Sequence, residues 1–246
     1  MKKITVYDWP TRIFHWLFSF LFLAAFVIAK TIDDDSSVFS YHMLAGLTIL
    51  FLLIFRLIWG FWGTTYARFS SFKLKPAELF EYFRDSVRTK TKRYTGHNPA
   101  SSYITVIMFV SVIGLAVTGL QMTNGADADI YEDVHELLAN LFMAAVIVHV
   151  TGILLHQFRH KDALWSSMIN GKKGSIPGED GIAGAKPFVG VLLIMITFIW
   201  VIYIGSQYDS NTQTLDLFGA ELSFGEENHE SPSDVDSGDQ EKWYDD

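Results

Sequence analysis

Five long apolar segments constrain the fold of this 246-residue chain more than any other feature. A helix needs about 20 apolar residues to cross the hydrocarbon core of a bilayer, within a range of roughly 17–25. Soluble chains of this length rarely collect their apolar residues in such blocks. The segments are residues 13–29, 42–62, 103–122, 135–155 and 187–204. The sequence therefore predicts an all-α membrane protein with five transmembrane helices.

The first segment has a rival interpretation. A basic head followed by an apolar run also fits a secretory signal peptide. No small-residue cleavage site follows convincingly, and His15 and Trp16 lie inside the run. We therefore expect a retained membrane helix.

The net charge of −8 belongs to one end of the chain. Residues 205–246 contain 12 Asp and Glu against a single Lys, so the remaining residues are slightly basic. This Ser- and Gly-rich tail is expected to be largely disordered. The chain has no Cys, which excludes disulfides, thiolate metal sites, iron–sulfur clusters and covalently attached haem. Nothing in the charge pattern favours nucleic-acid binding.

The basic residues predict the orientation in the membrane. Of the 19 Lys and Arg residues, 16 lie in residues 1–12, 63–102 and 156–186, and these segments alternate with acidic ones. The positive-inside rule places the basic segments in the cytoplasm, so the N-terminus is expected inside and the acidic tail in the periplasm. Within the second basic segment, residues 76–88 form an amphipathic pattern that favours a helix lying against the membrane surface.

One helix carries a histidine near each end. His149 follows His135 by 14 residues in the run VHELLANLFMAAVIVH. At about 100° per residue, both imidazoles leave the same face of the helix. At about 1.5 Å per residue they lie ~21 Å apart, about two thirds of a hydrocarbon core. This spacing suggests two stacked metal or haem sites.

The predicted orientation gives the depth of each histidine. His42 and His135 begin segments that enter from outside, so they pair toward the outer face. His15 begins a segment that enters from the cytoplasm, and His149 lies late in its own segment, so these two pair toward the inner face. Polar residues in a membrane interior are rare and usually functional. Two bis-histidine sites across the bilayer are expected.

Paired histidines favour haem b over zinc. Zinc sites in proteins usually gather four ligands in one cluster, whereas depth separates these histidines into twos. Iron with both axial positions filled has no open site for substrate, so one-electron transfer is the expected chemistry. The open alternatives are interhelical hydrogen bonding by individual histidines and a structural anchor or metal transporter that binds zinc or copper.

Other residues are candidates for holding the cofactor. Arg56 follows His42 by 14 residues and reaches the depth of the inner site, where a haem propionate would supply the anion that a buried guanidinium needs. Arg12 is a second candidate for this role, and the alternative for Arg56 is snorkelling to the headgroups. Gly46, Gly114 and Gly119 either leave room for porphyrin or let helices pack closely.

The remaining histidines have plainer interpretations. His156 and His160 are expected at the cytoplasmic interface, with a quinone head group, a proton path or a further metal as alternatives. His97 and His229 fall in polar segments and are interpreted as surface residues.

Three motifs resemble the bacterial cytochrome b561 family, which includes the b-type subunits of nickel–iron hydrogenases. They are VYDWPTRIFHW at the start, YHMLAG…RLIWG in the second segment and VHELLANLF…VIVH in the fourth. The resemblance covers about residues 1–175. It implies a four-helix cytochrome with two b haems in the cytoplasmic membrane, passing electrons between a quinone pool and a partner redox protein. The family's ligand positions match His15, His42, His135 and His149.

The expected protein therefore has three parts. Residues 1–175 form the four-helix transmembrane bundle with two bis-histidine haems, residues 176–204 a linker and fifth transmembrane helix, and residues 205–246 the outer acidic tail. We expect electron transfer between the quinone pool and an outer partner such as a c-type cytochrome or a hydrogenase-like protein, with the tail either steering a basic partner or only aiding solubility. The alternative is a stand-alone membrane oxidoreductase acting on superoxide or quinone.

Overall fold

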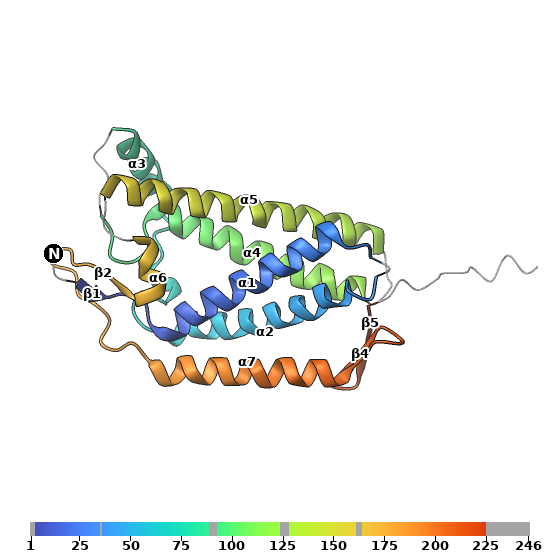
Figure 1. Ribbon diagram of the computed structural model, residues 1–246. Helices are drawn as coiled ribbons and strands as arrows, with labels where there is room; N and C mark the ends of the chain where they lie inside the picture. The colour runs from blue at the N-terminus through green and yellow to red at the C-terminus, as the bar shows by residue number, and fades with distance from the viewer. Residues whose placement is uncertain (1–2, 35, 89–92, 124–127, 161–163, 225–246) are drawn as a thin grey trace, which may run out of the picture.

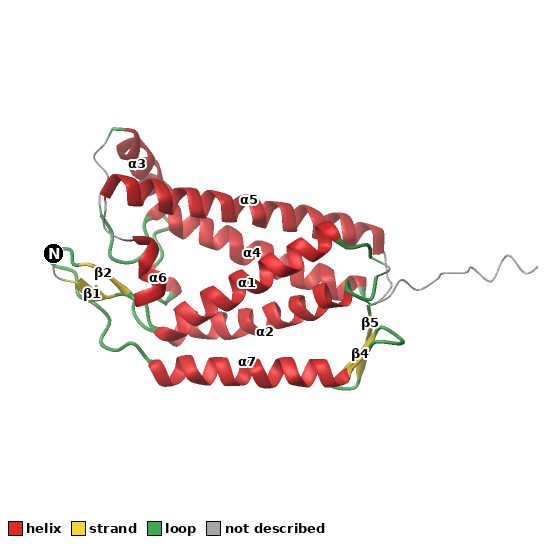
Figure 2. Ribbon diagram, in the orientation of Figure 1, coloured by secondary structure: helices red, strands yellow, loops and turns green. Residues whose placement is uncertain are grey.

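A computed structural model describes residues 3–34, 36–88, 93–123, 128–160 and 164–224 of the chain (Figure 1). Five of its helices are long and apolar enough to cross a membrane, which confirms the predicted number of spans. They are α1 (Trp9–Thr31), α2 (Ser40–Trp62), α4 (Pro99–Met122), α5 (Ala128–His160) and α7 (Pro187–Gln207). The chain is an all-α multi-pass membrane bundle with two small sheets at its ends (Figure 2).

Two of the spans begin on a side-chain cap followed by proline. Asp8 accepts a hydrogen bond from the backbone N–H of Thr11 at 2.8 Å, and Asn98 accepts one from the N–H of Ser101 at 2.7 Å. Each cap satisfies an amide that the first helical turn leaves free, and the proline after it loses nothing at that position. These caps start α1 and α4 four residues before the apolar runs themselves.

The helices pack as two antiparallel pairs with a fifth helix on the flank. The most extensive contacts join α4 to α5 and α1 to α2, and α7 packs on both α1 and α2 (Figure 1). Gly190 allows the close approach of α7, because a Cβ there would lie 2.8 Å from Cβ of Trp9. Inside the four-helix bundle, a buried apolar cluster joins Phe22, Ile49, Leu53, Val112 and Phe142.

The polar segments at the end of the bundle where the chain begins are also folded. Strand β1 (Lys3–Thr5) pairs antiparallel with β2 (Lys172–Gly174), which joins the head of the chain to the segment after α5. Between them in sequence lie η1 (Phe69–Ser71), α3 (Pro76–Val87), η2 (Leu164–Ser166) and α6 (Ser167–Asn170). Helix α3 confirms the predicted amphipathic helix, and Phe80 and Phe83 on it are exposed.

The first part of the C-terminal segment, residues 208–223, is folded, whereas the sequence predicted a largely disordered tail from residue 205. Strands β3 (Tyr208–Asp209), β4 (Thr214–Leu217) and β5 (Ala220–Ser223) form an antiparallel sheet at the opposite end of the bundle. Phe218 and Gly219 have positive φ, as a tight hairpin turn requires. Leu215 and Leu222 alternate with polar residues and are buried against Leu47, so this stretch has an apolar face despite its overall polarity. Residues 225–246 lie outside the described residues.

Candidate functional site

Helices α2 and α5 bring His42 and His135 together. Their ring centres are 6.1 Å apart, with the rings inclined at 67°. The predicted pairing of these two histidines is therefore what the fold produces. Lys30 near the end of α1 forms an ion pair with Glu136, next to His135, at 2.5 Å, which links α1 to α5 at the same end.

Hydrogen bonds fix which ring nitrogen each of these histidines presents. Nδ1 of His42 lies 2.9 Å from the carbonyl oxygen of Ala25, which can only accept, so Nδ1 carries the proton. Nδ1 of His135 lies 2.9 Å from the hydroxyl of Thr118, whose own proton is donated to the carbonyl of Gly114 at 2.9 Å. His135 therefore also donates from Nδ1. Each ring therefore has its lone pair on Nε2, the nitrogen that can bind a metal.

The two imidazoles are a donor set that fits a haem between the rings. Two metal–nitrogen bonds of about 2 Å each separate facing ring nitrogens by about 4 Å. Ring centres 6.1 Å apart are compatible with that separation. A neutral imidazole held by a hydrogen bond at its other nitrogen is the usual form of a metal-bound histidine.

His15 and His149 lie at the other end of the bundle. His15 follows the start of α1, His149 lies about three turns before the end of the antiparallel α5, and the two are close enough to interact electrostatically. Nδ1 of His15 is buried and has no hydrogen-bond partner among the described residues. Along α5, His135 thus lies against a histidine of α2, and His149 lies within electrostatic range of a histidine of α1.

Arg56 is buried beside the His15–His149 end. The residue is 4% exposed, so the alternative in which its guanidinium snorkels to the headgroups is not what the structure shows. Its Nη2 donates to the carbonyl of Ala67 at 3.0 Å, and its Cζ lies 5.3 Å from the ring centre of Phe69. Asp8, fully buried, interacts electrostatically with Arg56 but is hydrogen-bonded to Trp59 and Thr64 instead.

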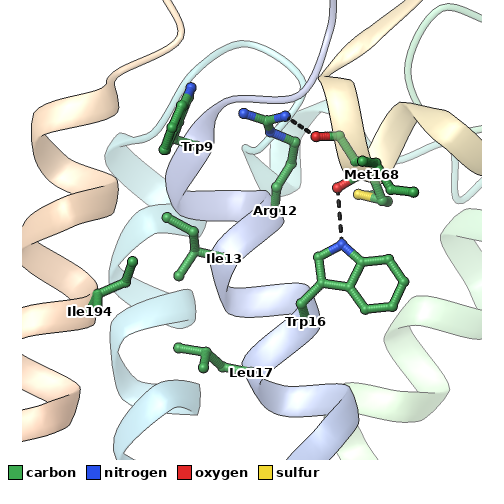
Figure 3. A pocket seen from close by; sticks show the side chains of 8 residues that line it. Trp9, Arg12, Ile13, Trp16, Leu17, Met168 and Ile194 are labelled. Atoms are coloured by element: carbon green, nitrogen blue, oxygen red, sulfur yellow. Dashed lines mark hydrogen bonds between the residues drawn. The ribbon is translucent and has the colours of Figure 1, made fainter.

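Arg12 lines a groove on the outside of the same end (Figure 3). Its guanidinium donates to the carbonyl of Ile169 and lies over the ring of Trp9, and Trp16 donates to the carbonyl of Met168 at 3.1 Å. The groove has a volume of about 480 Å³ and is walled mainly by aromatic and aliphatic side chains. It is lined by Trp9, Arg12, Ile13, Trp16, Leu17, Met168, Ile169 and Ile194, which come from α1, α6 and α7.

The three candidate glycines have different surroundings. A Cβ on Gly46, one turn after His42, would meet nothing within 4 Å. A Cβ on Gly119 would lie 3.4 Å from the ring of His135, so Gly119 lies against that ring. A Cβ on Gly114 would lie 2.6 Å from Cδ1 of Leu138, so Gly114 takes part in the packing of α4 on α5.

The sequence interpretation of His97 as a surface residue was wrong. Its Nδ1 is buried, and its ring contacts that of Phe72 with centres 4.8 Å apart. The Asn98-Pro99 step that follows is the sequence signal for its true position. Asn98 caps α4, so His97 lies directly before a membrane span. His160 lies at the end of α5, and His229 lies outside the described residues.

The profile of the family described as prokaryotic cytochrome b561 matches residues 6–171. The probable Ni/Fe-hydrogenase B-type cytochrome subunit of Rhizobium leguminosarum bv. viciae is 26% identical over 214 residues, which covers 70% of this chain and 89% of that protein. No solved structure matches the chain. The chain belongs to the prokaryotic cytochrome b561 family, and it is a membrane cytochrome of electron transfer whose family implies haem b.

Proposed function

We propose that this cytochrome carries electrons across the membrane through two b haems, each held by two histidines. His42 and His135 hold one haem, and His15 and His149 hold the other. The observation that carries the proposal is the meeting of His42 and His135 with the proton of each ring on Nδ1, which leaves the lone pair on Nε2. A b haem held by a pair of histidines would supply one-electron transfer when bound.

The surrounding residues serve to orient and enclose the haems. The carbonyl of Ala25 and the hydroxyl of Thr118 fix the rings of His42 and His135. Gly46 leaves space beside His42 for a flat ring, and Gly114 allows the close packing of α4 on α5 that holds Thr118 against His135. Arg12 and Arg56 supply positive charge for the carboxylates of the haem at the His15–His149 end.

The groove of Figure 3 is the proposed site of quinone exchange. It opens at the His15 end, and the ring of Trp16 in its wall lies 5.2 Å from the ring of His15. Aromatic and aliphatic walls suit a quinone ring and its tail. The exchange Ile194→Trp would narrow the groove.

The electron partner is proposed to be a redox protein on the side of the acidic tail, either a c-type cytochrome or a hydrogenase-like protein. The relative from Rhizobium leguminosarum is described as a probable Ni/Fe-hydrogenase subunit. The distribution of basic residues supports an N-terminus in the cytoplasm of a bacterial cell and a tail in the periplasm.

The haem content tests the proposal directly. The purified full-length chain is expected to contain two haems per chain and to show absorption bands of low-spin b haem. His42→Ala and His15→Ala should each lose about half of the haem, and the double variant nearly all of it. His229→Ala serves as the matched control and should retain both haems. A colourless preparation from haem-replete cells would contradict the proposal.

A further inference from the structure

Buried positive charge exceeds buried negative charge at the His15–His149 end. Among the described residues, the buried charged side chains are Arg56, Lys173 and Asp8. The two oxygens of Asp8 are already used, because they accept hydrogen bonds from the N–H of Thr11, the indole of Trp59 and the hydroxyl of Thr64. Charged groups that leave water are normally paired with an opposite charge. A further anion at this end would therefore pair with the excess positive charge.

Arg56 has an unused donor at this end. Nη1 is buried and makes no hydrogen bond with the described residues, whereas Nη2 is bonded to Ala67. The flat faces of the guanidinium are covered by aromatic rings, since Cζ lies 5.3 Å from the ring centre of Phe69 and 5.5 Å from that of Phe109. The two rings thus fix the orientation of the guanidinium, and its Nη1 has no acceptor among the described residues.

His97 presents a second unused nitrogen close by. Nδ1 of His97 is buried and has no hydrogen-bond partner among the residues that the structure describes. Phe72, which contacts His97, packs on Phe69 with ring centres 5.7 Å apart, and Phe69 packs on Arg56. His97 also interacts electrostatically with Arg56 and with His149.

The position of His97 is fixed by the chain around it. Nζ of Lys173 donates to the carbonyls of Thr95 and Gly96 at 3.0 and 3.3 Å, and Asn98 caps α4 on the other side. Burial and, to a smaller degree, the charge of Lys173 lower the pKa of His97 to about 3. The ring is therefore neutral at pH 7 and can offer one N–H without adding to the excess positive charge.

We infer that His97 and Arg56 together bind the carboxylate groups of the haem held by His15 and His149, Arg56 through Nη1 and His97 through Nδ1. The inference rests on the proposed function, and it makes His97 a positioning residue for that haem rather than a surface residue. Two fixed donors suit a cofactor with two carboxylates, and each bond to an ionised oxygen is stronger than one between neutral groups.

The redox potential of one haem provides the test. The carboxylates favour the oxidised iron, and a donor that offsets their charge raises the midpoint potential. In His97→Leu, at full haem content, we expect one of the two midpoint potentials to fall by about 59 mV, a tenfold change in the reduced-to-oxidised ratio. The other potential should stay unchanged. His97→Gln keeps an N–H donor and is expected to lie close to the unaltered protein.

The outcomes separate this inference from the proposed function. Failure of the proposed function would appear as missing haem in the unaltered chain, before any variant is made. If the His97→Leu protein fails to accumulate, the double variant His42→Ala/His97→Gln is compared with His42→Ala, and equal potentials with equal haem retention support the inference. Unchanged potentials in His97→Leu, or equal shifts in the Leu and Gln variants, would overturn it. A midpoint potential of the unaltered protein that follows the chloride or phosphate concentration would indicate a free anion at these donors and would also overturn it.

Discussion

The ring of Phe142 packs on the ring of Phe22 with centres 4.3 Å apart, midway between the two histidine pairs. Phe142 lies seven residues from both His135 and His149, and Phe22 lies seven residues after His15. Two helical turns advance the chain by about seven residues, so these side chains share the inward faces of the histidines. The bundle thus has an apolar aromatic layer between two polar layers.

Phe142→Ala is expected to destabilise the bundle by about 3 kcal/mol, since it opens a cavity in this layer. Phe142 is 2% exposed, so few neighbours can move to fill the space. Contacts rather than expulsion of water hold helices together in a membrane, which makes the loss of packing the main effect. Thermal loss of the haem absorbance measures it. Phe20→Ala, at a position 66% exposed, is the control and should change little. Equal stability of the two variants would contradict a stabilising role of the aromatic layer.

Thr118→Val is expected to weaken the site formed by His42 and His135. The hydroxyl of Thr118 accepts the Nδ1 proton of His135, and loss of such a bond typically lowers metal affinity about 10–100-fold. Haem retention during dialysis, together with a redox titration, measures the effect on one haem of the two. Thr197→Val is the matched control, because Thr197 makes the same bond to the preceding turn, to Leu193, at 2.8 Å. Retention unchanged in both variants would remove Thr118 from the site.

Gly46→Leu is expected to displace the haem beside His42. In the chain alone a Cβ at this position would meet no neighbouring atom within 4 Å, so the space beside Gly46 is open in the protein itself. A bulky group there would occupy the space proposed for the porphyrin. Gly205→Leu, at a helical position that is equally open, is the control. Half of the haem should be lost from the first variant and none from the second, and full haem content in both would assign Gly46 to another role.

The sequence predicted the helices and the pairing at His42 and His135 because both follow from local pattern. Apolar runs give the spans, and the positive-inside rule gives their relative direction, which sets the depth of each histidine. The pairing of His42 with His135 needs nothing more. The ends of helices were less accurate, because α5 continues through His160 beyond its apolar run and α1 starts at its cap, Asp8.

The remaining features depend on partners far away in sequence. His97 is held by Lys173, whose amine bonds the neighbouring carbonyls of Thr95 and Gly96, and no local signal links these segments. Strands β1 and β2 contain three residues each and pair across more than 160 residues. The C-terminal sheet is stabilised by packing on the apolar patch around Leu47, which is far away in sequence. The composition of residues 205–246 as a whole predicted disorder. It averages the short alternating stretch that forms the sheet with the strongly acidic stretch that follows.

Blocking the groove of Figure 3 is expected to slow the reduction of the haems by quinol without changing the haem content. Ile194→Trp should slow the reduction of the haems by a short-chain quinol roughly tenfold or more, while reduction by dithionite and the haem spectrum stay unchanged. Phe198→Trp, one turn further along α7 and 64% exposed, is the matched control. A quinol rate that is the same in both variants would place the exchange elsewhere.

Removing residues 225–246 is expected to slow electron transfer to a basic partner protein while leaving the spectrum intact. Most of the acidic residues after α7 lie in this segment, and the preceding sheet, with Leu215 fully buried, remains to cover the end of the bundle. A charged tail that attracts a partner acts over about a Debye length, ~10 Å at 0.1 M salt, so the difference should shrink as salt is raised. Stopped-flow oxidation by a basic c-type cytochrome at low and high salt measures the rate of this transfer.

A longer truncation that begins at residue 206 also removes the sheet and is expected to lower stability as well. Comparing the two truncations separates the covering role of the sheet from the charge of the tail. Equal rates for the full chain and the 225–246 deletion at low salt would leave the tail with a solubilising role alone.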